Sequence, residues 1–314
     1  MTPLRFRPIF QPRVWGGRAL ERLFDRPLPA DGRPYGESWE IVDRPEAQSV
    51  VDGGPFHGMS LHDLWTAHRE SIFGATAPES DRFPLLLKIL DAREDLSLQV
   101  HPPVGIASAL GGEPKTEMWY VAEAAAGAVL FAGVKPGVTA EAFGAALENG
   151  TAAELVPRLH PRSGDFIFIP SGRLHAIGGG LVIFEIQQNS DTTYRVFDWN
   201  RLGLDGKPRP LHISESLQCI DFTDAAPAFG IPQGEMLVEC PFFRVASLSI
   251  PPAGSRTIGK PGEFAMVVVI NGSGHLASVP LRPGDHVMLP AMADDRTLTT
   301  TSGIRVLQVN FGTA

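Results

Sequence analysis

The stretch PRSGDFIFIPSGRLHAI, residues 161–177, decides the fold, because a degenerate copy, LRPGDHVMLPAMADDRT, follows at residues 281–297. Each copy contains a Gly-Asp turn, alternating apolar residues and a proline. Alternation with a period of two is typical of a strand, and proline ends a strand because it has no N–H for the ladder. The repeat predicts two copies of one β fold. The second copy has Asp295 in place of His175, so we expect the chemistry of this position in the first copy alone.

Composition supports a mainly β protein. The 314 residues include 33 glycines and 28 prolines, which suit tight turns between many short strands. From about Gly234 onward, strand-like runs alternate with Gly, Pro and Asn turns, which predicts a second β-sandwich or barrel. We therefore expect an N-terminal domain over 1–233 and a degenerate β domain over 234–314. A few helices are expected inside the first domain, at 60–74 and 139–159.

Charge and hydropathy exclude several classes of protein. The net charge of −8 argues against nucleic-acid binding, which usually needs a basic surface. No apolar run reaches the roughly 18 residues of a membrane span, and the N-terminus lacks the apolar segment of a signal peptide. We expect a cytoplasmic protein in which Cys219 and Cys240 are reduced.

Four side chains on three segments form a candidate metal site. In LSLQVHPP, residues 96–103, Gln99 and His101 are two positions apart and share a strand face. Glu117 begins the next strand, and His175 follows the strand of the first repeat copy. On the inner face of a small antiparallel barrel these groups could meet, and they suit Zn²⁺ or a similar divalent ion. The alternative is a surface strand, with each histidine an ordinary surface or core residue.

Two charged residues lie inside apolar runs. Lys88, in LLLKIL, must snorkel, pair or serve a site. Glu185, in LVIFEIQ, is either a general base with a raised pKa or a paired structural carboxylate. The sequence contains no nucleophile elbow, phosphate-binding P-loop or dinucleotide-binding fingerprint.

Several motifs together resemble the short bacterial form of type I mannose-6-phosphate isomerase, a double-cupin enzyme family. They extend from Phe10 to about Arg201, whereas the C-terminal third matches only in its cupin-like pattern. The resemblance implies a mainly β fold of two cupin-type barrels or jelly rolls. The matching stretches are FQPRVWGG, GESWEI, PLLLKILDA, LSLQVHPP, KTEMWYV, GDFIFIPSGRLHAIGGG and EIQQNSDTTYRVFDW.

The resemblance also implies a site and a reaction. The family binds one zinc ion, or another divalent metal, and its ligands fall on Gln99, His101, Glu117 and His175. Its catalytic arginine falls on Arg195. Its active-site wall falls on Lys88, Ser97, Lys115, Glu185 and Asp191, and Arg201 is a further candidate for binding phosphate. The implied reaction interconverts mannose 6-phosphate and fructose 6-phosphate through a cis-enediol.

Other functions stay open at this point. The chain could bind a sugar phosphate without turning it over, as a sensor, or isomerise another aldose. A cupin dioxygenase with iron or manganese is a third class, but such enzymes usually carry a His-x-His pair where this chain has Gln99-Val100-His101. We expect a small sugar phosphate as partner, and either a monomer or a homodimer.

Overall fold

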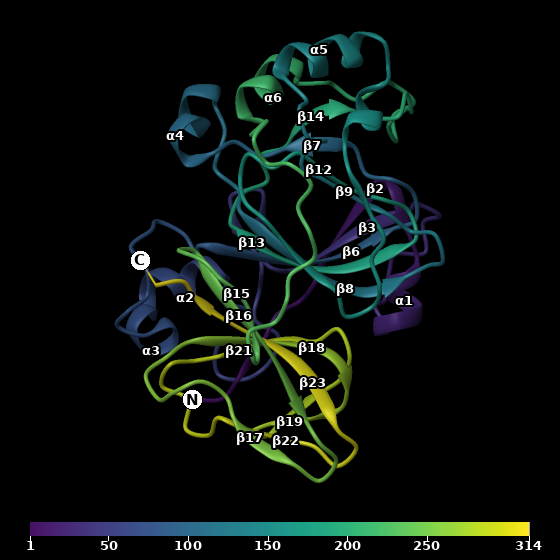
Figure 1. Ribbon diagram of the computed structural model, residues 1–314. Helices are drawn as coiled ribbons and strands as arrows, with labels where there is room; N and C mark the ends of the chain where they lie inside the picture. Colours follow the sequence, from purple (N-terminus) through teal and green to yellow (C-terminus); the bar gives the residue numbers. More distant parts are fainter. Residues whose placement is uncertain (314) are drawn as a thin grey trace.

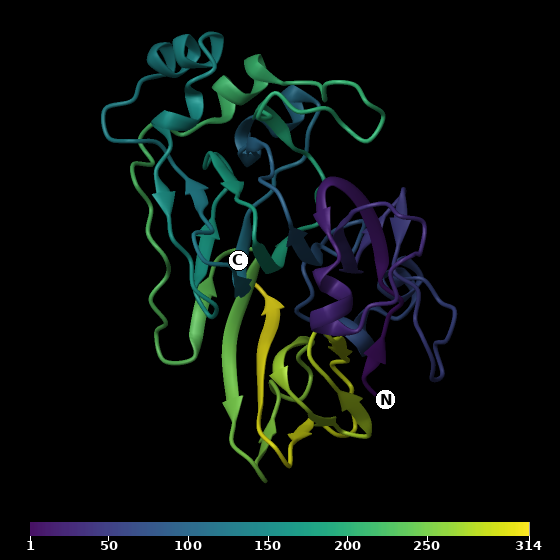
Figure 2. The ribbon, with the colours of Figure 1, turned by 90° about the vertical axis from the view of Figure 1, so that its right-hand side faces the viewer.

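The computed structural model describes residues 1–313, and most of its ordered elements are strands, as predicted. Two β modules lie one above the other in Figure 1, with the C-terminal module below. A side view shows the early segments of the chain beside both modules (Figure 2). None of the helices in residues 1–313 could span a bilayer, and the longest, α5, has nine residues.

Two antiparallel sheets build the larger module. The six-stranded sheet has the order β11-β8-β13-β6-β2-β3, and the five-stranded sheet has the order β10-β9-β12-β7-β14. The strands of the first sheet are β2 (Ile9–Gly17), β3 (Tyr35–Ile41), β6 (Leu85–Ala92), β8 (Glu117–Ala124), β11 (Phe166–Ile169) and β13 (Leu181–Gln188). Those of the second are β7 (Leu98–Val100), β9 (Leu130–Ala132), β10 (Arg158–Leu159), β12 (His175–Ile177) and β14 (Tyr194–Phe197).

The centre of the six-stranded sheet explains why two charged residues are buried. Strands β6 and β13 are apolar runs that pair antiparallel over their full length. Every residue of β6 is buried, including Lys88. The register places Glu185 directly opposite Lys88. The apolar sequence thus buries both strands, and the pairing brings the two charges together.

The smaller module contains the C-terminal strands and one from the start of the chain. Its six-stranded sheet has the order β1-β21-β18-β23-β16-β15, and a four-stranded sheet has the order β17-β22-β19-β20. Because β1 pairs with β21, the first residues belong to this sheet; the division at 233/234 stays a prediction. The strands are β1 (Leu4–Arg5), β15 (Met236–Glu239), β16 (Phe243–Ile250), β17 (Ser255–Thr257), β18 (Ala265–Gly272), β19 (Gly274–Leu276), β20 (Val279–Leu281), β21 (His286–Leu289), β22 (Thr297–Thr299) and β23 (Ile304–Phe311).

The two copies of the sequence repeat form the same turn and strand. Gly164 and Gly284 both have a positive φ, of 96° and 86°, a conformation that favours glycine. The carboxylate of Asp165 accepts the N–H of Arg162 at 2.7 Å, and Asp285 repeats this contact at 2.9 Å. The turns lead into β11 and β21, the first in the larger module and the second in the smaller.

Helices occur where the sequence predicts them, but they are shorter. The helix expected at 60–74 begins with a capping box between Ser60 and Asp63 and divides at His68 into α2 (Leu61–Ala67) and α3 (Arg69–Phe73). The one expected at 139–159 is α5 (Ala140–Glu148), because Gly150 turns the chain with a φ of 72°. The other helices are α1 (Ala19–Phe24), α4 (Val104–Ala107) and α6 (Ile213–Cys219), with 3₁₀ turns η1 (Ser108–Leu110) and η2 (Ala152–Leu155) and a small β4 (Asp43–Arg44)–β5 (Ala47–Gln48) hairpin.

Aromatic side chains join the two modules in one core. Phe83, which precedes β6 of the larger module, contacts Phe264 of the smaller one with ring centroids 5.7 Å apart, and Phe73 of α3 lies 5.6 Å from both Phe83 and Phe264. Phe264 also stacks on Phe311 at 4.7 Å. All four belong to one continuous buried cluster, so the modules share a hydrophobic core.

Candidate metal centre and active site

A cavity of about 600 Å³ opens in the larger module, between side chains of its two sheets. Eight of the eleven residues singled out in the sequence line this cavity. The exceptions are His101 and His175, which lie behind Glu117, and Arg201, which lies outside. The lining set is Lys88, Ser97, Gln99, Lys115, Glu117, Glu185, Asp191 and Arg195.

Three buried side chains converge at the wall of the cavity. His101, Glu117 and His175 are each 1% exposed, and their potential ligand atoms all lie within 4.8 Å of one another. The Nε2 atoms of the two histidines are each 3.5 Å from a carboxylate oxygen of Glu117. Three different strands or strand ends thus deliver one compact set of donors, as the sequence predicts.

Hydrogen bonds fix both imidazoles so that Nε2 faces the carboxylate. His101 Nδ1 donates to the carbonyl oxygen of Thr192 at 2.7 Å, and His175 Nδ1 donates to that of Arg173 at 2.8 Å. Burial, reinforced by Lys115, lowers the pKa of His101 to about 3, and burial also lowers the pKa of His175. Both rings are therefore neutral at pH 7 and present an Nε2 lone pair.

This donor set fits a divalent cation. Nε2 of His101 is fully buried without a hydrogen-bond partner, which is costly unless another group satisfies it. Neutral imidazoles oriented through Nδ1 by carbonyl oxygens, together with a carboxylate, are the usual ligands of Zn²⁺ and related ions.

Gln99 lies beside this set, on the strand that pairs with His175. In the orientation seen, its amide nitrogen is 3.3 Å from Nε2 of His175, and its carbonyl oxygen accepts from Ser97 Oγ at 3.3 Å. The two ends of a carboxamide have similar shapes and exchange when the amide turns over. Turned over, the amide would present its oxygen to a cation and its NH₂ to Ser97.

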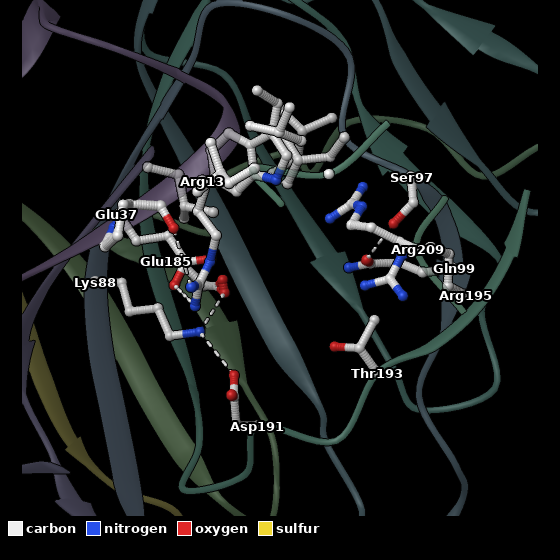
Figure 3. Close-up of a pocket in the computed structure, with 18 of the residues that line it drawn as sticks. Arg13, Glu37, Lys88, Ser97, Gln99, Glu185, Asp191, Thr193, Arg195 and Arg209 are labelled. Carbon is white, nitrogen blue, oxygen red and sulfur yellow. Dashed lines mark hydrogen bonds and ion pairs between the residues drawn. The ribbon is translucent and has the colours of Figure 1, made fainter. Parts of the chain in front are cut away.

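Two lysines connect the metal-binding set to a second buried carboxylate. Lys115 Nζ is 2.9 Å from Glu117 and 3.8 Å from Glu185. Lys88 Nζ is 3.9 Å from Glu185 and 4.0 Å from Asp191 (Figure 3). Burial raises the pKa of Glu185 to about 7, against the opposing effect of the two lysines. A carboxylate with such a pKa can both accept and return a proton near neutral pH.

Sequence reasoning missed the ion pair of Arg13 and Glu37, which lies on the same side of the cavity as Lys88 and Glu185 (Figure 3). Arg13 binds Glu37 through two hydrogen bonds of 3.0 and 3.1 Å, and both line the cavity. Trp39 Nε1 also donates to Glu37 at 2.6 Å, and the Trp39 ring lies 5.1 Å from Lys88 Nζ. Burial opposes ionisation of Glu37, but Arg13 and Lys88 outweigh it and lower its pKa to about 2. The alternation of Glu37 and Trp39 within GESWEI was the available signal.

Arginines gather on the opposite side of the cavity (Figure 3). Arg195 lines it, and its Nη1 donates to the carbonyl oxygen of Pro210 at 2.9 Å. Arg201 binds Asp198 outside the lining, so the geometry gives no support to its predicted contact with substrate. Arg209, which sequence reasoning missed, lines the cavity and binds the same Asp198. It lies in an irregular segment where no periodic pattern marks it.

A family model matches the N-terminal part of the chain, and known relatives match nearly all of it. The family model described as phosphomannose isomerase type I, catalytic domain, matches residues 4–132. Mannose-6-phosphate isomerase ManA of Bacillus subtilis is 38% identical over 301 residues, which cover 92% of this chain and 93% of that protein. Mannose-6-phosphate isomerase of Streptococcus mutans is 38% identical over 299 residues, with 92% of each covered.

Solved structures agree with the fold. The crystal structure of mannose 6-phosphate isomerase from Bacillus subtilis matches with a TM-score of 0.87 and 31% identity, covering 99% of this chain and 100% of that one. A structure of a putative mannosephosphate isomerase from Archaeoglobus fulgidus matches with a TM-score of 0.81 at 20% identity. This likeness confirms the predicted arrangement of β modules.

Proposed function

The chain belongs to the type I phosphomannose isomerase family, and on this premise we propose that it interconverts mannose 6-phosphate and fructose 6-phosphate. The observation that carries the proposal is a buried His101–Glu117–His175 set whose carboxylate contacts Lys115, which in turn contacts Glu185. A cation-binding set and a base with a pKa of about 7 thus share one cavity. Moving a proton between two neighbouring carbons requires a base, and a cation can stabilise the negative charge that develops on the substrate oxygens.

One divalent cation would be held by Gln99, His101, Glu117 and His175, and we propose Zn²⁺. The ligands carry one negative charge between them, because both imidazoles are neutral and the amide is uncharged. When bound, the ion supplies positive charge that stabilises negative charge developing on substrate oxygens.

Glu185 is the residue we propose as the base. Its carboxylate would remove the proton from C2 and return it to C1 through a cis-enediol, while a second proton passes from the C2 hydroxyl to the C1 oxygen. The reverse reaction would use the same group. Lys88 and Lys115, 3.9 and 3.8 Å from Glu185, offset its negative charge and orient it. Arg195, which stays charged, is proposed to bind an oxygen of the substrate, as are Ser97 and Asp191.

The base and the cation set distinguish this proposal from the alternatives. A sensor that only binds a sugar phosphate has no need of a carboxylate with a raised pKa between two lysines. A dioxygenase would place a second imidazole where Gln99 lies. Activity on another aldose remains compatible with the cavity. We further propose a cytoplasmic enzyme whose partner is a small sugar phosphate; monomer and homodimer both stay predictions.

Turnover tests the proposal directly. The zinc-loaded protein is mixed with mannose 6-phosphate, and fructose 6-phosphate is followed in a coupled assay, with unphosphorylated mannose in a parallel reaction. We expect turnover of the phosphorylated sugar. Saturable binding of mannose 6-phosphate without turnover would favour the sensor, and faster turnover of mannose would favour another aldose as substrate.

A further inference from the structure

Arg195 and Arg209 line one side of the cavity, called here the arginine side. This side contains more positive charge than its carboxylates neutralise. Asp198, 6% exposed, accepts hydrogen bonds from two guanidinium groups, those of Arg201 and Arg209. The contact with Arg209 is bidentate, with distances of 2.7 and 2.5 Å. Arg195 has no carboxylate within ion-pair distance among residues 1–313, and its buried Nε has no hydrogen-bond partner.

On the other side of the cavity, every cation has a carboxylate partner. There, Arg13 has Glu37, Lys88 has Glu185 and Asp191, and Lys115 has Glu117 and Glu185. On the arginine side the acidic residue of the lining is Asp205, because Asp198 lies outside it; Asp205 is exposed and accepts the backbone N–H of Lys207. The positive charge of Arg195 and Arg209 is not fully neutralised by carboxylates. Two such guanidinium groups in a cavity wall are suited to bind an anionic group of the ligand.

The backbone fixes Arg209 beside Arg195. The carbonyl oxygen of Pro210 accepts from Arg195 Nη1 at 2.9 Å. The backbone N–H of His212 donates to the carbonyl oxygen of Arg195 at 2.7 Å, and His212 Nδ1 accepts from the N–H of Arg195 at 3.3 Å. The segment 209–212 is therefore docked on β14. Burial, followed by the charge of Arg209, lowers the pKa of Arg195, as expected for two cations close together.

We propose that Arg209 binds the phosphate group of the substrate beside Arg195, and that Asp198 is the positioning residue that aims Arg209 into the cavity. The inference rests on the proposed function, since it names the part of the substrate that this wall recognises. It gives Arg209 the contact that the family resemblance implied for Arg201. Both arginines bind Asp198, but only Arg209 of the two lines the cavity.

The assignment also orients the substrate. With the phosphate at Arg209, the sugar chain runs past Ser97 and Gln99, which lie on the arginine side in Figure 3, toward Glu185 on the opposite side. Glu117 and its two histidines lie between these ends, because Gln99 contacts His175 and Lys115 contacts both Glu117 and Glu185. The phosphate is thereby held away from the base.

Two measurements on zinc-loaded protein test Arg209. Calorimetric titration with inorganic phosphate gives a Kd, and steady-state kinetics with mannose 6-phosphate give KM and kcat. For Arg209→Ala we expect both Kd and KM to rise on the order of tenfold, the effect of one charge-assisted hydrogen bond. We expect kcat to change far less, and Arg209→Lys to restore part of the affinity. If the alanine variant does not fold, Arg209→Gln, which keeps the stem without the charge, replaces it.

Matched variants separate contact from general charge. Arg201→Ala removes the other guanidinium on Asp198, and Lys207→Ala removes a charge from the same loop outside the cavity. Both are expected to raise Kd and KM less than Arg209→Ala does. An unchanged phosphate Kd in Arg209→Ala, or an equal rise in Lys207→Ala, would overturn the assignment. If the wild-type protein binds phosphate through Arg209 but does not turn over mannose 6-phosphate, the proposed function fails while Arg209 stands.

Discussion

Glu117 and Glu185 are buried carboxylates that face the cavity, and their contacts give them opposite properties. Lys115 lies 2.9 Å from Glu117 but 3.8 Å from Glu185. Burial disfavours ionisation of Glu117, yet the neighbouring ammonium of Lys115 favours it, and the pKa of Glu117 lies well below the usual range. For Glu185 burial prevails and raises the pKa to about 7. A permanently ionised carboxylate suits a metal ligand, and one that titrates near neutrality suits a base.

Replacing Glu185 with glutamine tests its role. The amide fills the same space but cannot accept the proton, so kcat is expected to fall about 100-fold or more while the bound metal, measured by elemental analysis, stays at the wild-type level. Glu123→Gln, a change at a partly exposed carboxylate on the neighbouring strand β8, serves as the control and should keep wild-type kcat. Wild-type kcat in Glu185→Gln would refute this assignment.

The pH profile reports the same group. As the proposed base, Glu185 would act only when ionised, and its pKa is raised to about 7. The active form is therefore lost as the pH falls through about 7, and kcat/KM should rise across pH 6 to 8 and level off above. Steady-state rates across this range measure it. A flat profile would show that Glu185 is not the titrating base.

At the scale of elements, an irregularity in β2 carries a short segment into the cavity. Pro12 and Gly17 both pair with Tyr35 of β3, so the residues between them bulge out of the ladder. The bulge includes Arg13 and Trp15, and both line the cavity. The bulge ends where the backbone of Gly16 lies against β3. An added Cβ at Gly16 would be 2.3 Å from the backbone nitrogen of Gly36.

A methyl group at Gly16 should therefore disturb both stability and activity. Gly16→Ala forces the two backbones apart, and we expect a loss of about 1–3 kcal/mol in the free energy of unfolding together with reduced kcat/KM. Gly144→Ala is the matched control, because an added Cβ there meets no atom within 4 Å and alanine favours the helix. Chemical denaturation measures both. Equal stability of the Gly16 variant and the wild type would contradict the close contact.

The sequence predicted the regular elements of the site better than its irregular ones. Strand β8 begins at Glu117, as expected, and the apolar runs around Lys88 and Glu185 form the buried centre of a sheet. Periodicity and apolar content mark such segments locally. Arg209 escaped detection because its place depends on a distant carboxylate, Asp198, and on a loop without a repeating pattern. The β2 bulge likewise depends on contacts with another strand.

The whole molecule is built from two related modules that share a core. The repeat predicted the two copies, but not the aromatic contact between them, because Phe83 and Phe264 are far apart in the sequence and no local pattern links them. The first strand, β1, crosses into the smaller module and pairs with β21. Neither module can therefore bury its hydrophobic surface alone.

Unfolding is expected to be a single transition. Because Phe73, Phe83, Phe264 and Phe311 form one cluster, loss of either module exposes the core of the other. Calorimetry should show one heat-absorption peak for the full chain, and a fragment of residues 1–233 should not give a cooperative transition. Phe264→Ala should lower the stability of the full chain by about 3–5 kcal/mol. Two separate peaks for the full chain would contradict a shared core.

The cation-dependent isomerase activity is the centre of the account, and metal removal tests it most directly. The protein is stripped with a chelator, the residual metal is measured, and the rate of fructose 6-phosphate formation from mannose 6-phosphate is compared before and after one equivalent of Zn²⁺ is restored. We predict that activity falls with the metal content and returns with the added ion. The His101→Ala variant, which lacks one ligand, should regain neither the bound metal nor the activity. Full activity in protein shown to be free of metal would contradict the account.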